Sequence, residues 1–512
     1  MSVQSPLRGT QQHQETAVDL ENQHAQRVPK TISQSPDGSP EPNQPNQYLV
    51  DWNGPDDPDN PQNWSKTKKW VITMMLSTLT FAATFASSVF SSATMATSER
   101  FRVNREVMVL GSSLFVLGFA LGPILWGPLS ELYGRKSPLF VGIFFCAIFQ
   151  IPVALAQNIE TILVCRFLGG IFGYSPMAVV GGALADIWDP IERGVAVGFF
   201  AGATFVGPLV GPVAGSFITQ SSLGWRWTEW LTLIIVASFG SIAVVVVPET
   251  SPAILLSRKA TFLRRNLKDA SYHAAHDSRN LDLHDILLRY ILRPLRMLFT
   301  EPILAFMTLF MSFVYGVFYL FFFSYPIAFS GQRGWSSGIA SLPFLGIIVG
   351  IVLGCGYIVW FTRTKYAVKM ASNGQVVPEE RLPPMFVGSV LFPLGLFWFA
   401  WTSSSTIIWV PQVLAGIPIG AGVLIIFIQG FNYIIDVYLA YANSALAANA
   451  LVRSLLGAAF PLFASAMYDA LGVAWATSLL GFLEVAMVPV PVLFYCYGRK
   501  IRGWSRMTMN KT

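Results

Sequence analysis

Twelve long apolar stretches, separated by polar segments, run along the chain. Each supplies the roughly 20 mostly apolar residues that an α-helix needs to cross a bilayer. Their centres lie near Leu79, Phe119, Phe149, Ile171, Gly207, Val236, Val314, Gly350, Leu394, Gly420, Leu455 and Glu484. A longer polar interruption, from Ser251 to around Arg296, separates the first six stretches from the last six. The pattern predicts an all-α membrane protein with twelve transmembrane helices in two six-helix halves.

The same pattern divides the chain into five segments. They are residues 1–69, a cytoplasmic N-terminal tail; 70–250, the first helical half; 251–300, a cytoplasmic central loop; 301–497, the second half; and 498–512, a basic cytoplasmic tail. The N-terminal tail is rich in Gln, Pro, Asn and Ser, so we expect most of it to be disordered. The charged central loop has the pattern of a surface amphipathic helix over residues 281–298, and we interpret the loop as a linker.

The distribution of Lys and Arg predicts the orientation of the chain, because these cations stay on the cytoplasmic side of membrane spans. With the N-terminus inside, few of the 34 cations fall in exterior loops: Arg100, Arg102, Arg105, Arg226 and Arg333. Both termini are therefore expected in the cytoplasm. The plasma membrane is the expected location, with the vacuolar membrane as an alternative. The net charge of +6 follows from this orientation and indicates no nucleic-acid partner.

Composition supports a membrane protein and argues against an enzyme. The chain is 53% hydrophobic and 12% charged, whereas soluble domains are about 25% charged. All five histidines lie in the N-terminal tail or the central loop, so no span offers a His metal ligand or a His base. No nucleotide-binding loop of the Gly-x-x-x-x-Gly-Lys-Ser/Thr type is present. We expect no metal and no cofactor, with a proton gradient as the energy source.

The polar turn between the second and third stretches reads Gly-Pro-Leu-Ser-Glu-Leu-Tyr-Gly-Arg-Lys. This turn resembles the helix 2 to helix 3 loop signature of the major facilitator superfamily, with Glu131 in place of the usual Asp. The resemblance implies that superfamily's fold and a charged cytoplasmic latch that stabilises the outward-facing state. The latch residues would be Gly127, Glu131, Gly134, Arg135, Lys136, Asp186 and Arg193. The alternative is a solvated cluster of charges with little energetic weight.

The fifth stretch carries regularly spaced small residues and prolines. They are Gly194, Ala203, Gly207, Pro208, Gly211, Pro212 and Gly215. The set resembles the antiporter motif of the same superfamily, although Ala203 and Pro212 depart from its stricter pattern. Glycines allow close helix contact and proline removes an intrahelical hydrogen bond, so ordinary small-residue packing is the alternative. The resemblance favours export over uptake.

Four further segments resemble fungal drug:proton antiporters of the twelve-span type: residues 52–64, 248–250, 381–384 and 444–449. The chain looks most like fungal toxin exporters such as the cercosporin exporter. This resemblance implies proton-coupled efflux of a small, mostly apolar compound by alternating access, with the substrate, protons and lipid as partners. Alternatives are a polyamine or nutrient transporter of the same fold and, from other classes, a nontransporting membrane sensor or a membrane-embedded enzyme.

Candidate coupling residues are the few charges inside or next to apolar stretches. Glu484 is the only acid near the middle of a span, and a buried acid can exchange a proton when its surroundings alternate. Arg166 lies within the fourth stretch and resembles the superfamily's buried helix 4 arginine. Asp436 and Arg453 complete the set. For Glu484 and Arg166, a purely structural role is the alternative, because a charge in a span normally faces the bundle and finds a partner.

Polar and aromatic residues in the second half are candidates for a substrate cavity. They are Gln429, Asn432, Asn449 and Phe313, with interhelical hydrogen bonding as the alternative role for the polar three. The seventh stretch is strongly aromatic, from Phe306 to Tyr325. We expect most of these rings to face lipid and a subset to stack on a planar substrate.

Overall fold

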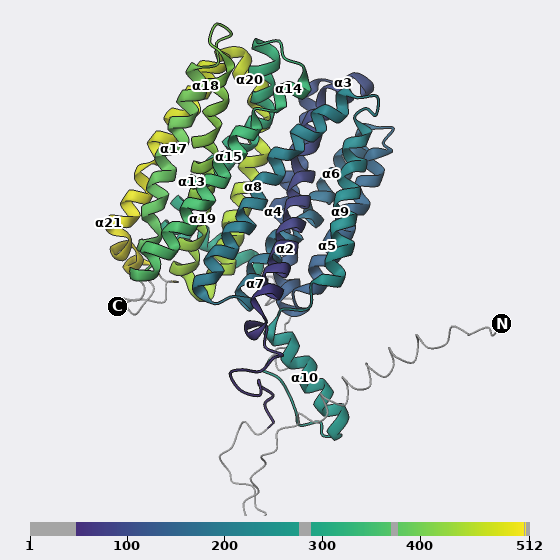
Figure 1. The fold of residues 1–512 in the computed structure, drawn as a ribbon, viewed down its shortest axis with the longest axis vertical. Helices are drawn as coiled ribbons and strands as arrows, with labels where there is room; N and C mark the ends of the chain where they lie inside the picture. Colours follow the sequence, from purple (N-terminus) through teal and green to yellow (C-terminus); the bar gives the residue numbers. More distant parts are fainter. Residues whose placement is uncertain (1–47, 276–287, 370–376, 506, 508–512) are drawn as a thin grey trace, which may run out of the picture. The chain divides into compact units, whose positions relative to one another are not determined.

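The computed structural model describes residues 48–275, 288–369, 377–505 and 507, and in this part of the chain the ordered elements are helices apart from one isolated β-bridge. The expected disorder of residues 1–47 and the first seven residues of the expected amphipathic helix at 281–298 fall outside the described residues, whereas residues 288–298 are helical. In the first half the helices are α2 (Lys66–Val89), α3 (Thr94–Phe101), α4 (Arg105–Leu132), α5 (Lys136–Ala154), α6 (Ile159–Gly173), α7 (Ser175–Ile187), α8 (Pro190–Gln220) and α9 (Arg226–Val246). Figure 1 shows them side by side in one bundle.

The second half forms the adjoining bundle, coloured green to yellow in Figure 1. Its helices are α12 (Arg293–Thr300), α13 (Pro302–Pro326), α14 (Ser337–Ser341), α15 (Phe344–Phe361), α17 (Leu382–Trp401), α18 (Trp409–Leu414), α19 (Gly416–Tyr438), α20 (Ala442–Met487) and α21 (Pro489–Trp504). Short 3-10 and π turns lie between them: η1 (Pro61–Asn63), η2 (Phe90–Ala93), η3 (Leu288–Leu292), η4 (Ile327–Gln332), η5 (Thr362–Tyr366), η6 (Pro378–Arg381) and η7 (Leu439–Tyr441). The all-helical fold and the two halves agree with the sequence.

Eleven helical segments of the described chain are long and apolar enough to cross a membrane. The last of them, Ala442–Gly503, has 62 residues, about three times the length that one crossing needs. Inside α20, Gly472 leaves the helical conformation with φ 72° and ψ 164°, values that favour glycine. The chain reverses there, so this segment supplies two crossings and the total is consistent with the twelve predicted spans.

Apolar side chains cover the outside of the bundle, whereas many polar side chains lie inside it. On α15, Val352 is 62% exposed and Leu353 57% exposed, as expected of a surface that meets lipid. On α2, small hydroxyl side chains are buried and several bond to the carbonyl one turn earlier: Thr73, Thr80, Thr84 and Ser87. The interior of the bundle therefore contains polar groups, and the α2 backbone satisfies these four hydroxyls.

The prediction that most aromatic rings of the seventh span face lipid is wrong. At one end of this aromatic run, Phe306 is 54% exposed. Five further rings are buried: Phe310, Phe313, Phe318, Phe322 and Tyr325. α13 packs against α19, α20 and α21 of its own half, and Phe318 meets Phe205 of α8 with ring centroids 5.5 Å apart. A helix that is apolar on every side carries no stripe to distinguish lipid from core.

The antiporter-motif glycines of α8 lie against α2. A Cβ placed on Gly207 would stand 2.6 Å from the Phe81 carbonyl oxygen, and one on Gly211 would stand 3.0 Å from the Val89 backbone nitrogen. Gly215 approaches the same segment of α2. These three glycines therefore allow the two backbones to touch, which is the small-residue packing that the sequence left open.

Residues 48–60 and 256–275, with part of α10 (Pro252–Leu267), form a second compact unit. Leu49 and His273 form the isolated β-bridge, and Val50, Ala260 and Ala274 make a small apolar core. The carboxylate of Asp57 accepts the backbone N–H groups of Asn53 and Asp59. Burial by itself would raise the pKa of Asp57, but these bonds and the Lys259 ammonium at 3.5 Å hold the pKa below its usual range.

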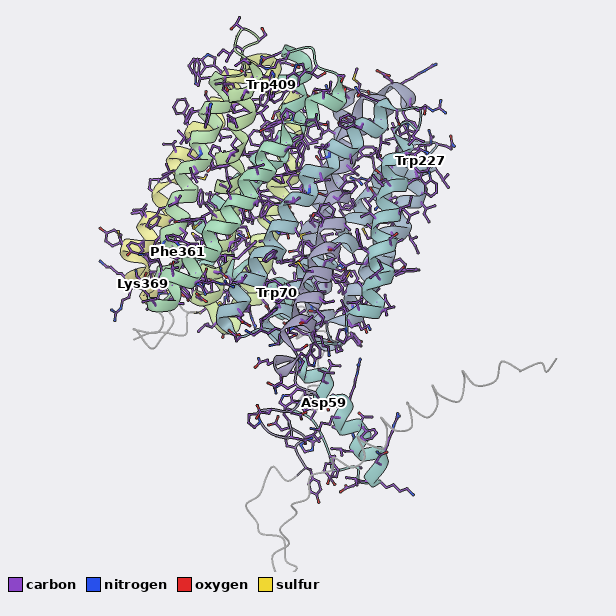
Figure 2. The ribbon with its side chains drawn as sticks, in the orientation of Figure 1. Asp59, Trp70, Trp227, Phe361, Lys369 and Trp409 are labelled. Carbon is purple, nitrogen blue, oxygen red and sulfur yellow. The ribbon has the colours of Figure 1, made fainter. Side chains whose placement is uncertain are left out.

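The pairing within this unit also tests the topology. The bridged residues Leu49 and His273 come before α2 and after α9, so they must lie on the same side of the membrane. An even number of crossings has to separate them, and six lie between them. Figure 2 shows Trp227 and Trp409 toward one end of the helical bundle, and Trp70 and Phe361 toward the other. Aromatic side chains at both ends are typical of the two membrane interfaces.

Candidate transport site

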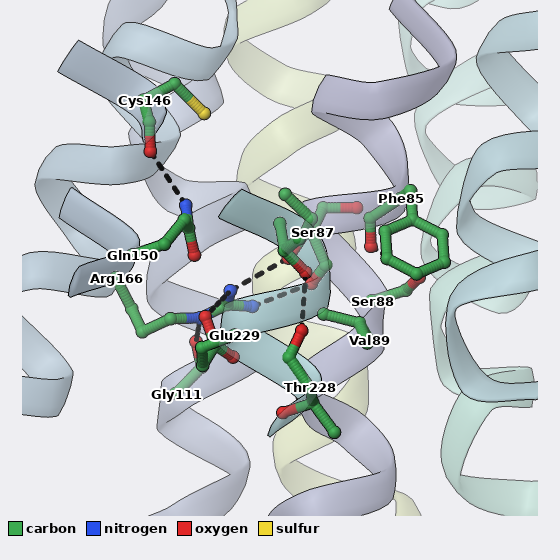
Figure 3. Close-up of polar contacts among 12 residues, drawn as sticks. Phe85, Ser87, Ser88, Val89, Gly111, Cys146, Gln150, Arg166, Thr228 and Glu229 are labelled. Atoms are coloured by element: carbon green, nitrogen blue, oxygen red, sulfur yellow. Dashed lines mark hydrogen bonds and ion pairs between the residues drawn. The ribbon is translucent and has the colours of Figure 1, made fainter. Parts of the chain in front are cut away.

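A buried ion pair lies in the first half, between α6 and α9 (Figure 3). Arg166 Nη1 lies 3.6 Å from Glu229 Oε2, and both side chains are fully buried. Arg166 also donates from Nε to the Gly111 carbonyl at 3.0 Å and from Nη1 to the Ala86 carbonyl at 2.8 Å. Neither Glu229 oxygen accepts a hydrogen bond within the described residues. The arginine is thus held by backbone carbonyls, and the acid is held only loosely by the arginine.

Hydrogen bonds continue from this pair to the second half. Arg166 Nη2 donates to the Ser87 carbonyl at 3.3 Å, and the Ser87 hydroxyl lies 2.9 Å from the Tyr319 hydroxyl on α13. Tyr315 donates to Tyr319 at 3.4 Å. Because the Ser87 hydroxyl also donates to the Thr84 carbonyl at 2.6 Å, donation runs from Tyr315 through Tyr319 to Ser87. A polar path therefore joins the two halves near the buried ion pair.

The four coupling residues predicted from the sequence lie in different surroundings. Arg166 belongs to the ion pair, and Arg453 lies between α20 and aromatic rings of α13 and α19. Asp436 is 2.9 Å from Arg381 Nε, an ion pair with both side chains mostly buried. Glu484 is 1% exposed, and its Oε1 has no hydrogen-bond partner in the described part of the chain. The structure does not bring Glu484 and Asp436 to the Arg166 pair.

The candidate cavity residues occupy buried positions of the second half. Asn449 is fully buried and donates to Thr308 at 3.4 Å, while its Oδ1 has no partner among the described residues. Gln429 is 1% exposed with its Oε1 likewise unpaired there, and Asn432 is half-buried on the same helix. Phe313 meets Phe460 with ring centroids 5.4 Å apart. Unpaired buried acceptors are unusual in a packed interior, so these side chains remain candidates for a substrate cavity.

At the predicted cytoplasmic end, Arg135 organises the latch. Its Nε donates to Asp186 at 3.0 Å, with both side chains mostly buried. The backbone N–H groups of Arg135 and Lys136 donate to the two oxygens of Glu249, at 2.8 and 3.2 Å. A Cβ on Gly134, whose φ is 85°, would collide with that carboxyl group. The turn therefore needs glycine, and Glu249 ties the helix 2 to helix 3 loop to the end of the sixth span.

Glu131 has a different role from Arg135. Its carboxylate accepts hydrogen bonds from the Tyr290 hydroxyl and, at 2.8 Å, from Asn443 Nδ2 at the start of α20. Lys136 reaches the Val244 carbonyl at the surface. Within the described residues no ion pair joins Arg193 to the latch, whereas Glu192 beside it pairs with Lys66. Gly127 lies near the Tyr290 ring. The latch thus has one contact inside the first half and one between the halves.

Sequence reasoning missed the roles of three residues in these contacts. Glu229 stands near a span end and Glu249 follows the sixth span, and neither position indicates a partner by itself. Tyr319 lies in an aromatic run that gave no polar signal. The available signal was the intramembrane Arg166, which had to find a partner, and Glu229 is an acid at the same predicted depth on another span.

Arg135→Ala is expected to slow transport while leaving protein abundance and membrane insertion near normal. Loss of this contact would shift the balance between conformations by about 1 to 2 kcal/mol, roughly a fivefold to thirtyfold change. Transport of a fluorescent substrate in vesicles measures the rate. Arg363→Ala is the matched control, because this arginine occupies the equivalent turn of the second half and is exposed. Equal rates in both variants would refute a role for the latch.

Two six-helix halves that meet around buried polar side chains are the architecture of a secondary transporter. A profile of the Major Facilitator Superfamily matches residues 75–461. This match covers most of the chain, so the protein belongs to the major facilitator superfamily and is a multi-pass membrane transporter. No group of three or more His, Cys, Asp or Glu side chains that could hold a metal occurs among the residues that the structure describes.

Named relatives agree with this assignment. The chain is 56% identical over 462 residues to the citrinin biosynthesis cluster MFS transporter of Monascus ruber, covering 90% of this chain and 92% of the relative. It is 46% identical over 464 residues to the cercosporin MFS transporter of Cercospora nicotianae, covering 90% of each. The proton:xylose symporter XylE shares the fold, with a TM-score of 0.60 and 15% identity over 85% of this chain and 96% of that chain. The predicted superfamily, fold and likeness to fungal toxin exporters are confirmed.

Proposed function

We propose that this transporter exports a small, mostly apolar compound in exchange for protons, by alternating access between its two halves. The observation that carries the proposal is the buried Arg166–Glu229 pair, which is joined by hydrogen bonds to α13 of the opposite half. An acid placed on such a path can sense which side of the membrane is open. The named relatives support the substrate class, since they are transporters of the citrinin cluster and of cercosporin.

We assign the coupling proton to Glu229 rather than to Glu484, which the sequence favoured. Protonation of Glu229 would remove the 3.6 Å ion pair, but Arg166 would keep its carbonyl partners on α2 and α4. The change is therefore local and reversible, and its effect reaches α2, which contacts both α8 and Tyr319. Glu484 belongs to the last span, whose neighbours include α17 of its own half.

The latch at the cytoplasmic end takes part in this mechanism. When the halves rock, Glu131 must leave Asn443 and Tyr290, whereas the Arg135–Asp186 pair stays within the first half.

The proton gradient supplies the energy for export, and a membrane potential adds about 2.3 kcal/mol per charge for each 100 mV. The proposal includes no metal, no cofactor and no enzymatic step. It places the protein in the plasma membrane with both termini in the cytoplasm, the vacuolar membrane being the alternative.

Cells that lack the protein are expected to retain more of a hydrophobic, planar test compound than cells that contain it. The difference should vanish when a protonophore collapses the gradient, and it should survive ATP depletion while the gradient is held. Accumulation of the compound, measured with and without protonophore, tests both parts. Lower accumulation in the cells that lack the protein would show that it takes the compound up, as a nutrient or polyamine carrier does. No difference under any condition would favour a sensor.

A further inference from the structure

Arg453 is a buried cation that forms no ion pair with an acid of the described residues. It lies about 17 Å along α20 from Ala442, close to half of a hydrocarbon core of about 30 Å. Its side chain belongs to a residue only 5% exposed, and its Nε has no hydrogen-bond partner within the described residues. None of the ion pairs formed by those residues includes it. A charge at this depth is costly to bury unless a counter-charge compensates it.

Aromatic faces surround this guanidinium. Its central carbon lies 4.8 Å from the ring centroid of Tyr315, 5.8 Å from that of Phe427 and 5.5 Å from that of Phe431. Cation–π contacts stabilise the charge in part, but they give the Nε–H group no acceptor among the described residues. A flat conjugated molecule that enters between these rings would stack on them and present its own acceptors to the guanidinium. The surroundings thus favour a planar ligand.

Both halves contribute to this position. Tyr174, which precedes α7 in the first half, lies close enough to Arg453 to interact with it electrostatically across the interface. One turn beyond Arg453, a Cβ on Gly457 would lie 2.8 Å from the Tyr315 ring and 3.2 Å from Val116 of α4. The halves meet here without spare room at Gly457, so separating them would release Arg453 from Tyr174. A site that changes with the rocking of the halves is what alternating access requires.

We propose that Arg453 binds the anionic group, a carboxylate or ionised phenol, of a planar aromatic substrate at the interface between the halves. The planar guanidinium matches two carboxylate oxygens at once, which a lysine would not do. Asn449, one turn away on the same face of α20, supplies an unpaired amide oxygen that can accept a second hydroxyl of the substrate. The proposal rests on the proposed function and narrows its substrate from apolar compounds to aromatic organic anions.

The same position connects substrate with proton. Tyr315, whose ring lies against Arg453, begins the hydrogen-bond path through Tyr319 and Ser87 to Arg166. An anion at Arg453 would redirect the hydroxyl of Tyr315 or Tyr174, and the change would reach the Glu229 pair through three hydrogen bonds. No bond is made or broken in the substrate. Outward movement of an anion against inward movement of a proton is driven by an inside-negative potential as well as by the proton gradient.

The test compares two flat probes of the same shape, 2-naphthoate and the neutral 2-naphthamide, on the purified full-length transporter in lipid nanodiscs. Calorimetry at pH 7 measures their affinities without any gradient. Wild-type protein is expected to bind 2-naphthoate about tenfold or more tightly than the amide, because charge-assisted hydrogen bonds are the stronger class. Arg453→Gln should lose this preference while binding the amide nearly as before. Arg363→Gln, an exposed arginine, should retain it.

Equal binding of the two probes by wild-type protein, no binding of 2-naphthoate, or an unchanged preference in Arg453→Gln would each overturn the proposal. Arg453→Lys covers the case in which the Gln variant fails to fold, since it keeps the charge but loses the planar fork. It should fall between wild type and no preference. The accumulation assay in cells and the probe-binding assay test different claims. Inward transport in cells would refute export and leave this anion site standing, whereas equal binding of the two probes would refute the site and leave export standing.

Discussion

Replacing Glu229 with Gln is expected to abolish proton-driven transport. The amide keeps the size of the side chain and stays beside Arg166, but it cannot ionise, so no proton can be carried. In proteoliposomes, uptake against a concentration gradient driven by an imposed pH difference should fall to background. Exchange of labelled for unlabelled substrate, which needs no net proton movement, should continue. The ratio of the two activities separates loss of coupling from general inactivation.

Two further variants make this result decisive. Glu229→Gln leaves Arg166 as an uncompensated buried charge, a change that costs about 3 to 5 kcal/mol when a buried pair is broken. The double variant Glu229→Gln with Arg166→Gln removes both charges and should fold better, yet remain uncoupled. Glu484→Gln should keep proton-driven transport. Loss of coupling in Glu484→Gln, with normal coupling in Glu229→Gln, would return the proton to the acid that the sequence predicted.

Gly211→Val is expected to destabilise the transporter severely. Its Cβ would stand 3.0 Å from the Val89 nitrogen and 3.1 Å from the Phe85 carbonyl oxygen, and both are backbone atoms that cannot move aside. Overpacking of a tight contact costs about 1 to 3 kcal/mol or more, and here it would force α2 and α8 apart. The yield of monodisperse protein and its melting temperature in detergent measure the effect.

Gly202→Val is the matched control on the same helix. A Cβ at Gly202 has no neighbour within 4 Å, so the substitution changes helix propensity by the same amount without a clash. It should be expressed and melt nearly as wild type. Similar behaviour of the two variants would mean that the glycines of α8 do not hold it against α2, and that the antiporter motif has no packing role here.

The sequence predicts the architecture well because the bilayer restricts the solutions. Stretches of about 20 apolar residues have to become helices, and the cation bias gives them an orientation. The turn at Gly134 and the latch residue Arg135 were equally accessible, since a short motif fixes their local geometry. These features depend on residues that are close together in the chain.

Contacts between distant segments were not predictable in the same way. The partner of Arg166 could be any polar group at its depth, and only the packing of α9 beside α5 and α2 selects Glu229. For α13, the sequence shows an unbroken apolar surface, and its burial follows from neighbours on all sides. Asp436 looked like a membrane acid, but Arg381, from a turn far away in sequence, accounts for its charge.

The bridge between Leu49 and His273 imposes an order on synthesis. Residues 48–60 leave the ribosome before any span, whereas the segment that carries His273 follows only when the whole first half has been made, about 200 residues later. At typical translation speeds of about 5 to 20 residues per second, that interval lasts roughly 10 to 40 seconds. During this time Val50 and the backbone beside it have no partner. Closure of the small unit therefore requires that the first half has been inserted with an even number of crossings.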